Sequence, residues 1–234
     1  MSIVNYTVRD EVALIQMDDG KANALSPDMI AQLSDAFDRA LEEAKAVVLT
    51  GREGRFCGGF DLKVVMSGPE PAKALFSAGT DLYLKMYALG IPLVAACSGH
   101  AVAGGVLLLG ASDVRIGAEG AFKLGLNETA IGMPLPIFAH TIASERLARP
   151  HLFAATLGAT LFSPAEAVEV GWLDEVVAQG ALIERAMAEA TRLAPLAGDA
   201  FRISKVSMRG ATIAHVRDTL DEDLSNLVGQ LKFN

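Results

Sequence analysis

Short strand-like segments that alternate with helical ones constrain the fold of this chain more than any other feature. Three such segments, at 46–50, 92–97 and 113–116, are separated by helical patterns at 70–90 and 104–109. Strands joined by crossover helices run parallel and are covered by those helices, so their residues are mostly apolar. This part of the chain therefore predicts a parallel sheet within an α/β fold.

The segments that precede this region predict a hairpin and a helix. Residues 2–8 and 11–17 alternate in polarity, as the two strands of a β-hairpin do. Ser26 and Pro27 are typical of a helix start. The apolar residues that follow at three- and four-residue steps predict one buried helix face: Ile30, Leu33, Phe37 and Leu41.

After residue 134 the pattern becomes mostly helical. Six segments have helical periodicity: 135–147, 150–157, 164–170, 180–193, 197–209 and 211–230. One short strand is expected near 173–177. The last two helical segments are expected to form a helix pair that packs on the body of the protein or on a neighbouring subunit.

The composition limits the classes of partner. Hydrophobic residues make up 51% of the 234 residues, which is enough for one well-buried core. The net charge is -8 and no basic stripe is present, so nucleic acid is not an expected partner. Any phosphate group must then be met by individual lysine or arginine side chains.

The sequence predicts a cytoplasmic protein that does not enter a membrane. The first residues lack the charged and apolar regions of a signal peptide, and the longest apolar stretch, around 101–110, is too short to cross a bilayer. Cys57 and Cys97 have no metal-ligand spacing. They are expected to be reduced, half-buried thiols, and no metal site is predicted.

Two glycine-flanked turns that follow predicted strands carry the chemistry. They lie at 56–62 and 98–105, and the second leads into a helix that begins at Gly104. Glycine lets a ligand approach the backbone closely, and free N–H groups at a helix start attract negative charge. Two such turns that face each other would form an oxyanion hole, whereas each alone also fits an ordinary strand-to-helix connection. His100, in the second turn, is a candidate for a polar role there.

Five short motifs, in this order and spacing over most of the chain, resemble the enoyl-CoA hydratase/isomerase family, the crotonases. Segments 56–63 and 99–105 resemble its two fingerprints, and 21–25 is similar to its early CoA-binding turn. Residues 125–132, Gly-Leu-Asn-Glu-Thr-Ala-Ile-Gly, resemble its catalytic segment. Residues 165–177 resemble its late helix and strand.

The resemblance implies a fold and an assembly. The implied fold class is α/β, a crotonase-like ββα spiral with a helical C-terminal trimerisation region. The spiral core is expected over 1–190 and the C-terminal helical region over 191–234. The family also implies a homotrimer or a dimer of trimers.

The resemblance further implies roles for individual residues. The N–H groups of Phe60 and Gly104 match the pair that holds the thioester oxygen. Glu128, which by itself would also fit a surface loop, matches a carboxylate that moves a proton near the α-carbon. The positions that match the CoA-binding residues are Lys21, Ala22, Ala24 and Lys63. Lys63 is expected to meet a phosphate. No tightly bound cofactor is implied, because coenzyme A is part of the thioester substrate.

Leu107 is the main departure from the family. Its hydratases position a water with two glutamates, and the second of these falls three residues after Gly104, where this chain has Leu107. Leucine neither orients water nor accepts a proton, whereas double-bond isomerisation needs one base that takes a proton from C2 and returns it at C4. Without the second glutamate, the catalytic segment is closest to that of the Δ3,Δ2-enoyl-CoA isomerases. Ala103 also replaces a third glycine that many members carry.

The leading prediction is therefore a Δ3,Δ2-enoyl-CoA isomerase that acts through an enolate stabilised by an oxyanion hole, with Glu128 as the proton shuttle. An enoyl-CoA hydratase of fatty-acid β-oxidation that uses Glu128 alone is the first alternative. A non-catalytic acyl-CoA binder is the second, because the loss of one catalytic carboxylate is a step toward the loss of both. All three would bind an acyl-CoA thioester.

Overall fold

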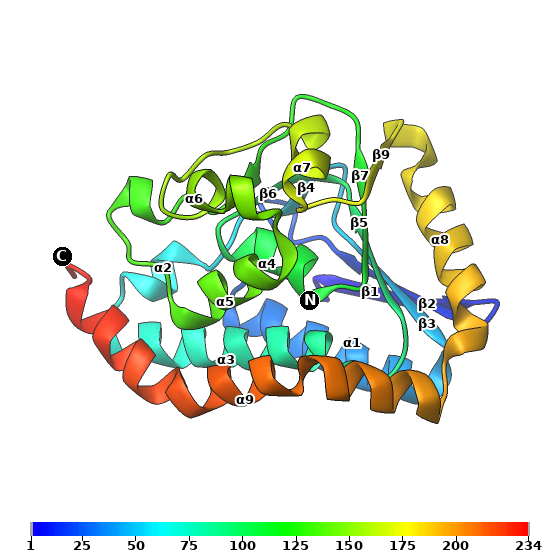
Figure 1. Ribbon diagram of the computed structural model, residues 1–234, viewed down its shortest axis with the longest axis horizontal. Helices are drawn as coiled ribbons and strands as arrows, with labels where there is room; N and C mark the ends of the chain where they lie inside the picture. Colours follow the sequence, from blue (N-terminus) through cyan, green and yellow to red (C-terminus); the bar gives the residue numbers. More distant parts are fainter. Residues whose placement is uncertain (1, 234) are drawn as a thin grey trace.

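The computed structural model describes residues 2–233, and their strands form two sheets. The strands are β1 (Val4–Arg9), β2 (Val12–Met17), β3 (Ala46–Thr50), β4 (Gly54–Cys57), β5 (Leu93–Cys97), β6 (Gly99–Val102), β7 (Val114–Ala118), β8 (Leu124–Gly125) and β9 (Glu175–Val177). The larger sheet has the order β1-β2-β3-β5-β7-β9, and the smaller has the order β4-β6-β8. The β1–β2 pair is antiparallel, and the other neighbouring pairs are parallel (Figure 1).

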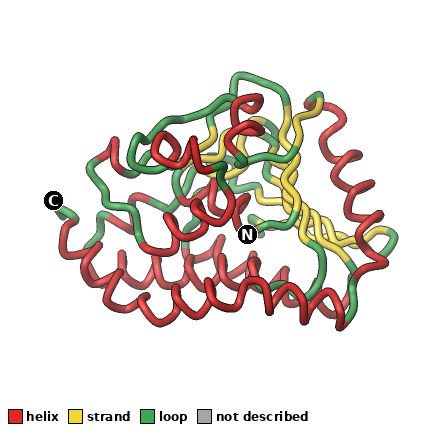
Figure 2. Tube along the Cα trace, viewed as in Figure 1, coloured by secondary structure: helices red, strands yellow, loops and turns green. Residues whose placement is uncertain are grey.

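Helices cover both faces of the larger sheet. They are α1 (Pro27–Glu43), α2 (Leu62–Val65), α3 (Pro69–Tyr87), α4 (Gly104–Ala111), α5 (Ile137–Arg146), α6 (Leu152–Ala155), α7 (Pro164–Val170), α8 (Leu182–Leu193) and α9 (Asp199–Gln230). Helix α8 packs across β3, β5 and β7, whereas α1 packs against β1 and β2. Figure 2 shows the strands gathered between these helices, with loops above them.

Alternate residues of the central strands face two different cores. In β3, Val48 packs with Val94 in the core beneath α8, whereas Val47 and Leu49 join the main core on the other side. All five residues of this strand are buried, as expected for a parallel strand that is covered on both faces. The predicted parallel sheet is confirmed, and so is the preceding hairpin.

Helix α1 begins as predicted but buries one residue other than the expected one. The Met29 N–H donates to the Ser26 hydroxyl at 3.1 Å, which caps the helix. Leu41 was predicted to face inward, and this is wrong, because its side chain is 46% exposed. Ala40 faces inward instead. Because a helix has 3.6 residues per turn, steps of four residues drift away from the buried face, which at this point is one residue earlier than expected.

The predicted helix pair at 197–209 and 211–230 is wrong: these residues form the single 32-residue helix α9. Gly210, which separates the two predicted segments, lies in its middle. A glycine in an exposed helix interior costs about 1 kcal/mol, which is too little to break a helix that is packed along its length. Helix α9 runs beside α3 and also contacts α5 (Figure 1).

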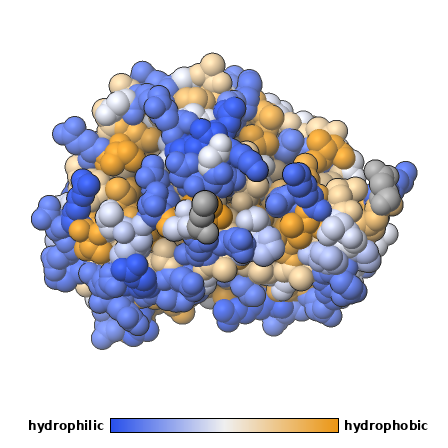
Figure 3. Space-filling model, turned by 180° about the vertical axis from the view of Figure 1, so that it is seen from behind, coloured by the Kyte–Doolittle hydropathy of each residue, from blue (hydrophilic) through white to orange (hydrophobic). Residues whose placement is uncertain are grey.

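Both cysteines lie in the interior of the protein. Cys57 and Cys97 are free thiols, but they are buried to 2% exposure or less and not half-buried as predicted, because both faces of their strands are covered. Burial raises the pKa of each thiol to about 12. The face in Figure 3 is mostly hydrophilic, with hydrophobic residues in scattered patches.

The boundary expected between the 1–190 core and the 191–234 region falls within α8, and the division stays a prediction. From residue 2 to residue 233, no helix combines the length and the apolar character that a membrane crossing requires.

Candidate active site

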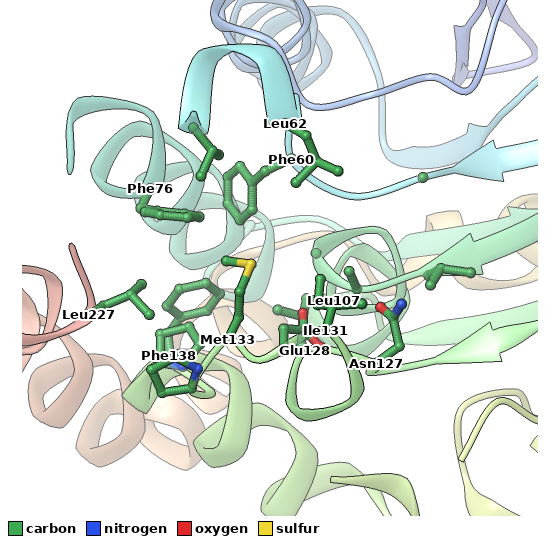
Figure 4. Close-up of a pocket in the computed structure, with 17 residues that line it drawn as sticks. Phe60, Leu62, Phe76, Leu107, Asn127, Glu128, Ile131, Met133, Phe138 and Leu227 are labelled. Carbon is green, nitrogen blue, oxygen red and sulfur yellow. The ribbon is translucent and has the colours of Figure 1, made fainter. Parts of the chain in front are cut away.

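A pocket of about 120 Å³ lies at the ends of β4 and β6 and brings three distant segments together. Phe60, Gly104 and Glu128, the three residues predicted for catalysis, all line it. Figure 4 shows Phe60 on one side and Glu128 on the other, with Leu107 next to Glu128. Most of the remaining wall is apolar and includes Leu62, Val65, Phe76, Met133, Phe138 and Leu227.

The first turn is held so that the Phe60 N–H is free. The Leu25 N–H donates to the Gly59 carbonyl at 2.8 Å, and the Asp61 N–H donates to the Leu25 carbonyl at 3.2 Å. Successive peptide groups of extended chain point to opposite sides, so the N–H of Phe60 points away from Leu25. Within residues 2–233 no acceptor is recorded for this N–H group.

Asn23 fastens the early turn to the sheets. Its side-chain amide is fully buried and donates to the backbone carbonyls of Met17 at 3.1 Å and Phe56 at 3.2 Å. Its φ of +52° lies in the left-handed region, where asparagine is tolerated better than most residues. The turn that contains Lys21, Ala22 and Ala24 is thereby held against the strand that leads to Phe60.

The second turn contains a strained residue. Ala103 has φ +53° and ψ −134°, a conformation that favours glycine and costs an alanine about 1–3 kcal/mol. Its N–H donates to the Gly125 carbonyl at 2.9 Å, which ties the turn to the segment that leads to Glu128. Gly104 begins α4, and the first N–H groups of a helix have no partner within it. No acceptor for the Gly104 N–H is recorded among the described residues.

The two turns touch each other. A Cβ added to Gly59 would lie 3.0 Å from the Ala103 Cβ and 3.3 Å from the Gly104 nitrogen. A Cβ added to Gly104 would lie 3.0 Å from the Phe60 ring. Glycine at both positions therefore permits the contact, and the two free N–H groups belong to adjacent backbone segments on the wall of one pocket. This arrangement is able to bind one carbonyl oxygen with two donors.

Glu128 is the ionisable side chain among the described residues that line the pocket. Its side chain is buried at 8% exposure, and its Oε2 has no hydrogen-bond partner among the described residues. Burial raises the pKa of Glu128 to about 7, although its own N–H and that of Asn127 act in the opposite direction. A carboxyl group that is half ionised near neutral pH is well suited to take up and return a proton.

Leu107 faces the same pocket. It lies three residues after Gly104 on α4, so both residues share one side of the helix, and its side chain is 1% exposed. Among the described residues that line the pocket, Glu128 is the single carboxylate. The pocket therefore has one proton-transfer group beside two potential oxyanion donors.

The predicted CoA-binding residues lie outside this pocket. They are Lys21, Ala22, Ala24 and Lys63. Ala22 is adjacent to it, because its carbonyl accepts the N–H of the pocket residue Gly58 at 2.9 Å. Lys63 is exposed and follows the pocket residue Leu62 in α2. The Asp61 carboxylate caps α2 by accepting the Lys63 N–H at 2.9 Å. The assignment of these four residues to CoA stays a prediction.

Several pocket residues were not found by sequence reasoning. Phe76, Phe138 and Leu227 come from α3, α5 and α9, and each lies on an apolar helix face that reads as ordinary core. Asn127 was part of a recognised motif but carried no prediction of its own. His100 does not line the pocket; its Nδ1 accepts the Lys123 N–H at 3.1 Å.

Comparison with known proteins places this geometry in a family. The family model described as enoyl-CoA hydratase/isomerase matches residues 7–229. The human mitochondrial enoyl-CoA delta isomerase 1 is 30% identical over 224 residues, which cover 93% of this chain and 74% of that protein. The Mycobacterium tuberculosis enoyl-CoA hydratase EchA19 is 34% identical over 177 residues, 70% of this chain and 64% of that protein.

A solved structure gives the same result for the fold. The crystal structure of human mitochondrial Δ3,Δ2-enoyl-CoA isomerase superposes with a TM-score of 0.93 at 27% identity, covering 97% of this chain and 91% of that one. The chain belongs to the enoyl-CoA hydratase/isomerase family. The predicted family and the predicted crotonase fold are both confirmed.

Proposed function

We propose that this protein is a Δ3,Δ2-enoyl-CoA isomerase. The observation that supports this proposal most is that Glu128 is the single carboxylate among the described residues that line the pocket. The same pocket exposes two free N–H groups, and it has Leu107 at the position where a hydratase needs a second glutamate. The relatives of similar sequence include enzymes named as isomerases. The substrate in this proposal is an acyl-CoA thioester with a double bond between C3 and C4.

The chemistry follows from the three residues. The thioester oxygen accepts hydrogen bonds from the N–H groups of Phe60 and Gly104, which stabilise negative charge on that oxygen. The Glu128 carboxylate takes a proton from C2, and the electron pair spreads over a dienolate. The same carboxyl group returns the proton at C4, so the double bond moves to C2–C3. Glu128 ends the cycle ionised, as it began it.

The apolar wall supports isomerisation over water addition. Phe76, Phe138 and Met133 line the pocket without offering a hydrogen bond to water. Leu107 lines the pocket at the position that matches the second glutamate of the family's hydratases, and its side chain has no group that could orient an attacking water. A proton held by Glu128 in such surroundings is returned to the substrate more readily than it is exchanged with solvent.

The Glu128→Gln substitution tests the proposal. We expect kcat for conversion of a 3-enoyl-CoA to the conjugated 2-enoyl-CoA to fall by about 10³-fold, because glutamine accepts no proton. The rate is followed by ultraviolet absorbance of the conjugated thioester, and KM is expected to change little. Glu166→Gln is a control, because Glu166 is exposed and caps α7. A wild-type rate in Glu128→Gln would exclude the proposed mechanism.

Enoyl-CoA hydration is the second candidate. It is supported by the relatives named as hydratases, one of which is 34% identical to this chain. The same preparation is therefore assayed with 2-enoyl-CoA, and hydration as fast as isomerisation would favour a hydratase that uses Glu128 alone. Tight binding of acyl-CoA without turnover of either substrate would select the non-catalytic binder.

Three further expectations go with the proposal. They are contact of coenzyme A with Lys21, Ala22, Ala24 and Lys63, assembly as a homotrimer or a dimer of trimers, and a cytoplasmic location. Exposed apolar residues on α9 support the expected association: Ile203, Val206 and Met208, the last of which is 84% exposed.

A further inference from the structure

Tyr83 connects the two turns that carry the free N–H groups, although it does not line the pocket. It lies on α3 with no exposed surface. Its hydroxyl donates a hydrogen bond of 2.6 Å to the Gly104 carbonyl. This residue attracts no attention in the sequence, where a tyrosine among leucines on a helix reads as core.

The ring of Tyr83 contacts the other turn. It meets the Phe60 ring edge to face, with centroids 6.2 Å apart and an interplanar angle of 86°. On its far side it stacks on Phe138 at 5.3 Å. Phe60 is also held by the edge of Phe76 at 4.9 Å. Tyr83 thus forms a hydrogen bond with Gly104, which offers one free N–H group, and packs on Phe60, which offers the other.

The second turn needs such support. Ala103 holds a glycine-like conformation, which persists only where neighbouring contacts impose it. On one side, the hydrogen bond from the Ala103 N–H to the Gly125 carbonyl holds this conformation. On the other side, the next carbonyl, that of Gly104, is fixed by Tyr83. The space is filled as well, because a Cβ on Gly104 would lie 2.8 Å from the Tyr83 hydroxyl oxygen.

The Tyr83 hydroxyl remains a donor at every pH at which the protein would work. Burial holds its pKa well above its usual range, and the negative charges that Cys57 and Glu128 can carry act in the same direction. The bond to Gly104 is therefore not switched by the titration of Glu128.

We propose that Tyr83 is a positioning residue that holds the N–H groups of Phe60 and Gly104 at the spacing that one thioester oxygen requires. It acts through these two residues and touches no substrate. The proposal rests on the proposed function, because it assumes that a thioester carbonyl occupies the pocket.

The test compares Tyr83→Phe with Tyr87→Phe. Tyr87 lies one turn further along α3, is nearly as buried, and contacts the Arg209 guanidinium instead of the pocket. For Tyr83→Phe we expect kcat with 3-enoyl-CoA to fall about 10- to 100-fold with KM within about twofold, since small misplacements of catalytic donors have effects of this size. Tyr87→Phe is expected to keep kcat within about twofold.

A spectroscopic readout separates positioning from a loss of stability. Saturated hexanoyl-CoA labelled with ¹³C at the thioester carbonyl is bound to each protein, and its infrared stretch is recorded. Two donors lower this frequency, so Tyr83→Phe should reduce the shift while Tyr87→Phe preserves it. The shifted band comes only from ligand bound to folded protein, whereas free ligand absorbs at the unshifted frequency, so partial unfolding lowers the intensity of the shifted band without moving it.

The outcomes distinguish the two proposals. An unchanged carbonyl shift and unchanged kcat in Tyr83→Phe would overturn the role of Tyr83, and so would equal losses of kcat in both variants. If the wild type binds hexanoyl-CoA with a lowered stretch but turns over no 3-enoyl-CoA, the isomerase proposal fails. In that case the carbonyl shift alone decides the role of Tyr83. A wild type that leaves the stretch of hexanoyl-CoA unshifted would overturn both proposals.

Discussion

Glu128 couples the chemistry of the pocket to the stability of the fold. A carboxyl group is normally ionised at neutral pH, but burial raises the pKa of Glu128 to about 7. The folded protein therefore binds a proton more tightly at this position than the unfolded chain does. The feature that suits Glu128 to proton transfer also makes its ionised form unfavourable for folding.

The pH dependence of activity and stability follows from this shift. In the wild type, kcat/KM should rise about tenfold per pH unit below pH 7 and level off above it, because the proposed mechanism requires Glu128 as the carboxylate. Stability contributed by the protonated group is present below the unfolded pKa of 4.5 and lost as pH rises toward about 7. Between pH 5 and pH 8, urea denaturation should show a loss of about 2–3 kcal/mol.

Glu128→Gln isolates the contribution of this one group. The variant should be more stable than the wild type at pH 8, and the difference should fall to about 1 kcal/mol at pH 5, because glutamine has no proton to lose. Other groups that titrate in this range affect both proteins alike. The same pH dependence of stability in both proteins would show that Glu128 is not the group with the raised pKa.

Residues inside contiguous motifs could be predicted from the sequence, whereas residues that meet only in space could not. Phe60 and Gly104 stand in glycine-flanked turns that match the two fingerprints of the family, and Glu128 stands in the segment that matches its catalytic one. Tyr83 and Leu227 enter through long-range packing of α3 and α9. Their local pattern is that of any buried helix face, so no sequence signal separates them from core residues.

At the scale of elements, the site depends on two turns that must touch. Gly59 is at the contact, with φ +90° and little room for a Cβ. The family resemblance implied the ββα spiral, but hydrophobic periodicity did not predict the individual strands of the smaller sheet, because β8 has two residues and β4 and β6 have four each. Strands so short carry too little alternation to be recognised.

Gly59→Ala should separate the turns. The added methyl group meets Ala103 at 3.0 Å and the Gly104 nitrogen at 3.3 Å, so we expect kcat to fall by about 10²-fold or more, the effect of losing one oxyanion donor. Gly54→Ala is the matched control, because Gly54 has a similar φ of +75° but open space around it. It should lose about 1 kcal/mol of stability and keep its activity. Equal activity in the two variants would contradict the importance of the contact.

At the scale of the whole molecule, α9 connects two distant regions. Near its start, Lys205 and Arg209 bind the Asp113 carboxylate at 2.7 and 2.9 Å. Leu227 lies 22 residues after Lys205, about 33 Å away along the same helix, and lines the pocket. Because α9 is a single helix and not a pair, an anchor at one end helps to position the pocket wall at the other.

Asp113 is the centre of this anchor and is largely shielded from water. Its side chain is 16% exposed and that of Lys205 is 5% exposed. Burial lowers the pKa of Lys205 to about 8, and the charge of Asp113 opposes this effect. Asp113 also accepts the Leu93 N–H at 2.9 Å, which joins the anchor to β5. Removal of the carboxylate would leave a buried ammonium without its counter-charge.

Asp113→Asn should therefore destabilise the protein by about 3 kcal/mol at pH 6, measured by urea denaturation. Part of the loss should be recovered as pH rises toward 9, because the folded pKa of Lys205 is lowered and the neutral amine is favoured in the folded state. Asp199→Asn is the control: Asp199 pairs with Arg202 on the exposed start of α9, where such a pair contributes less than about 1 kcal/mol. If both variants lost the same small amount of stability, the ion pairs between Asp113 and α9 would not anchor the helix. The position of Leu227 would then be set by the packing of α9 against α3 and α5 alone.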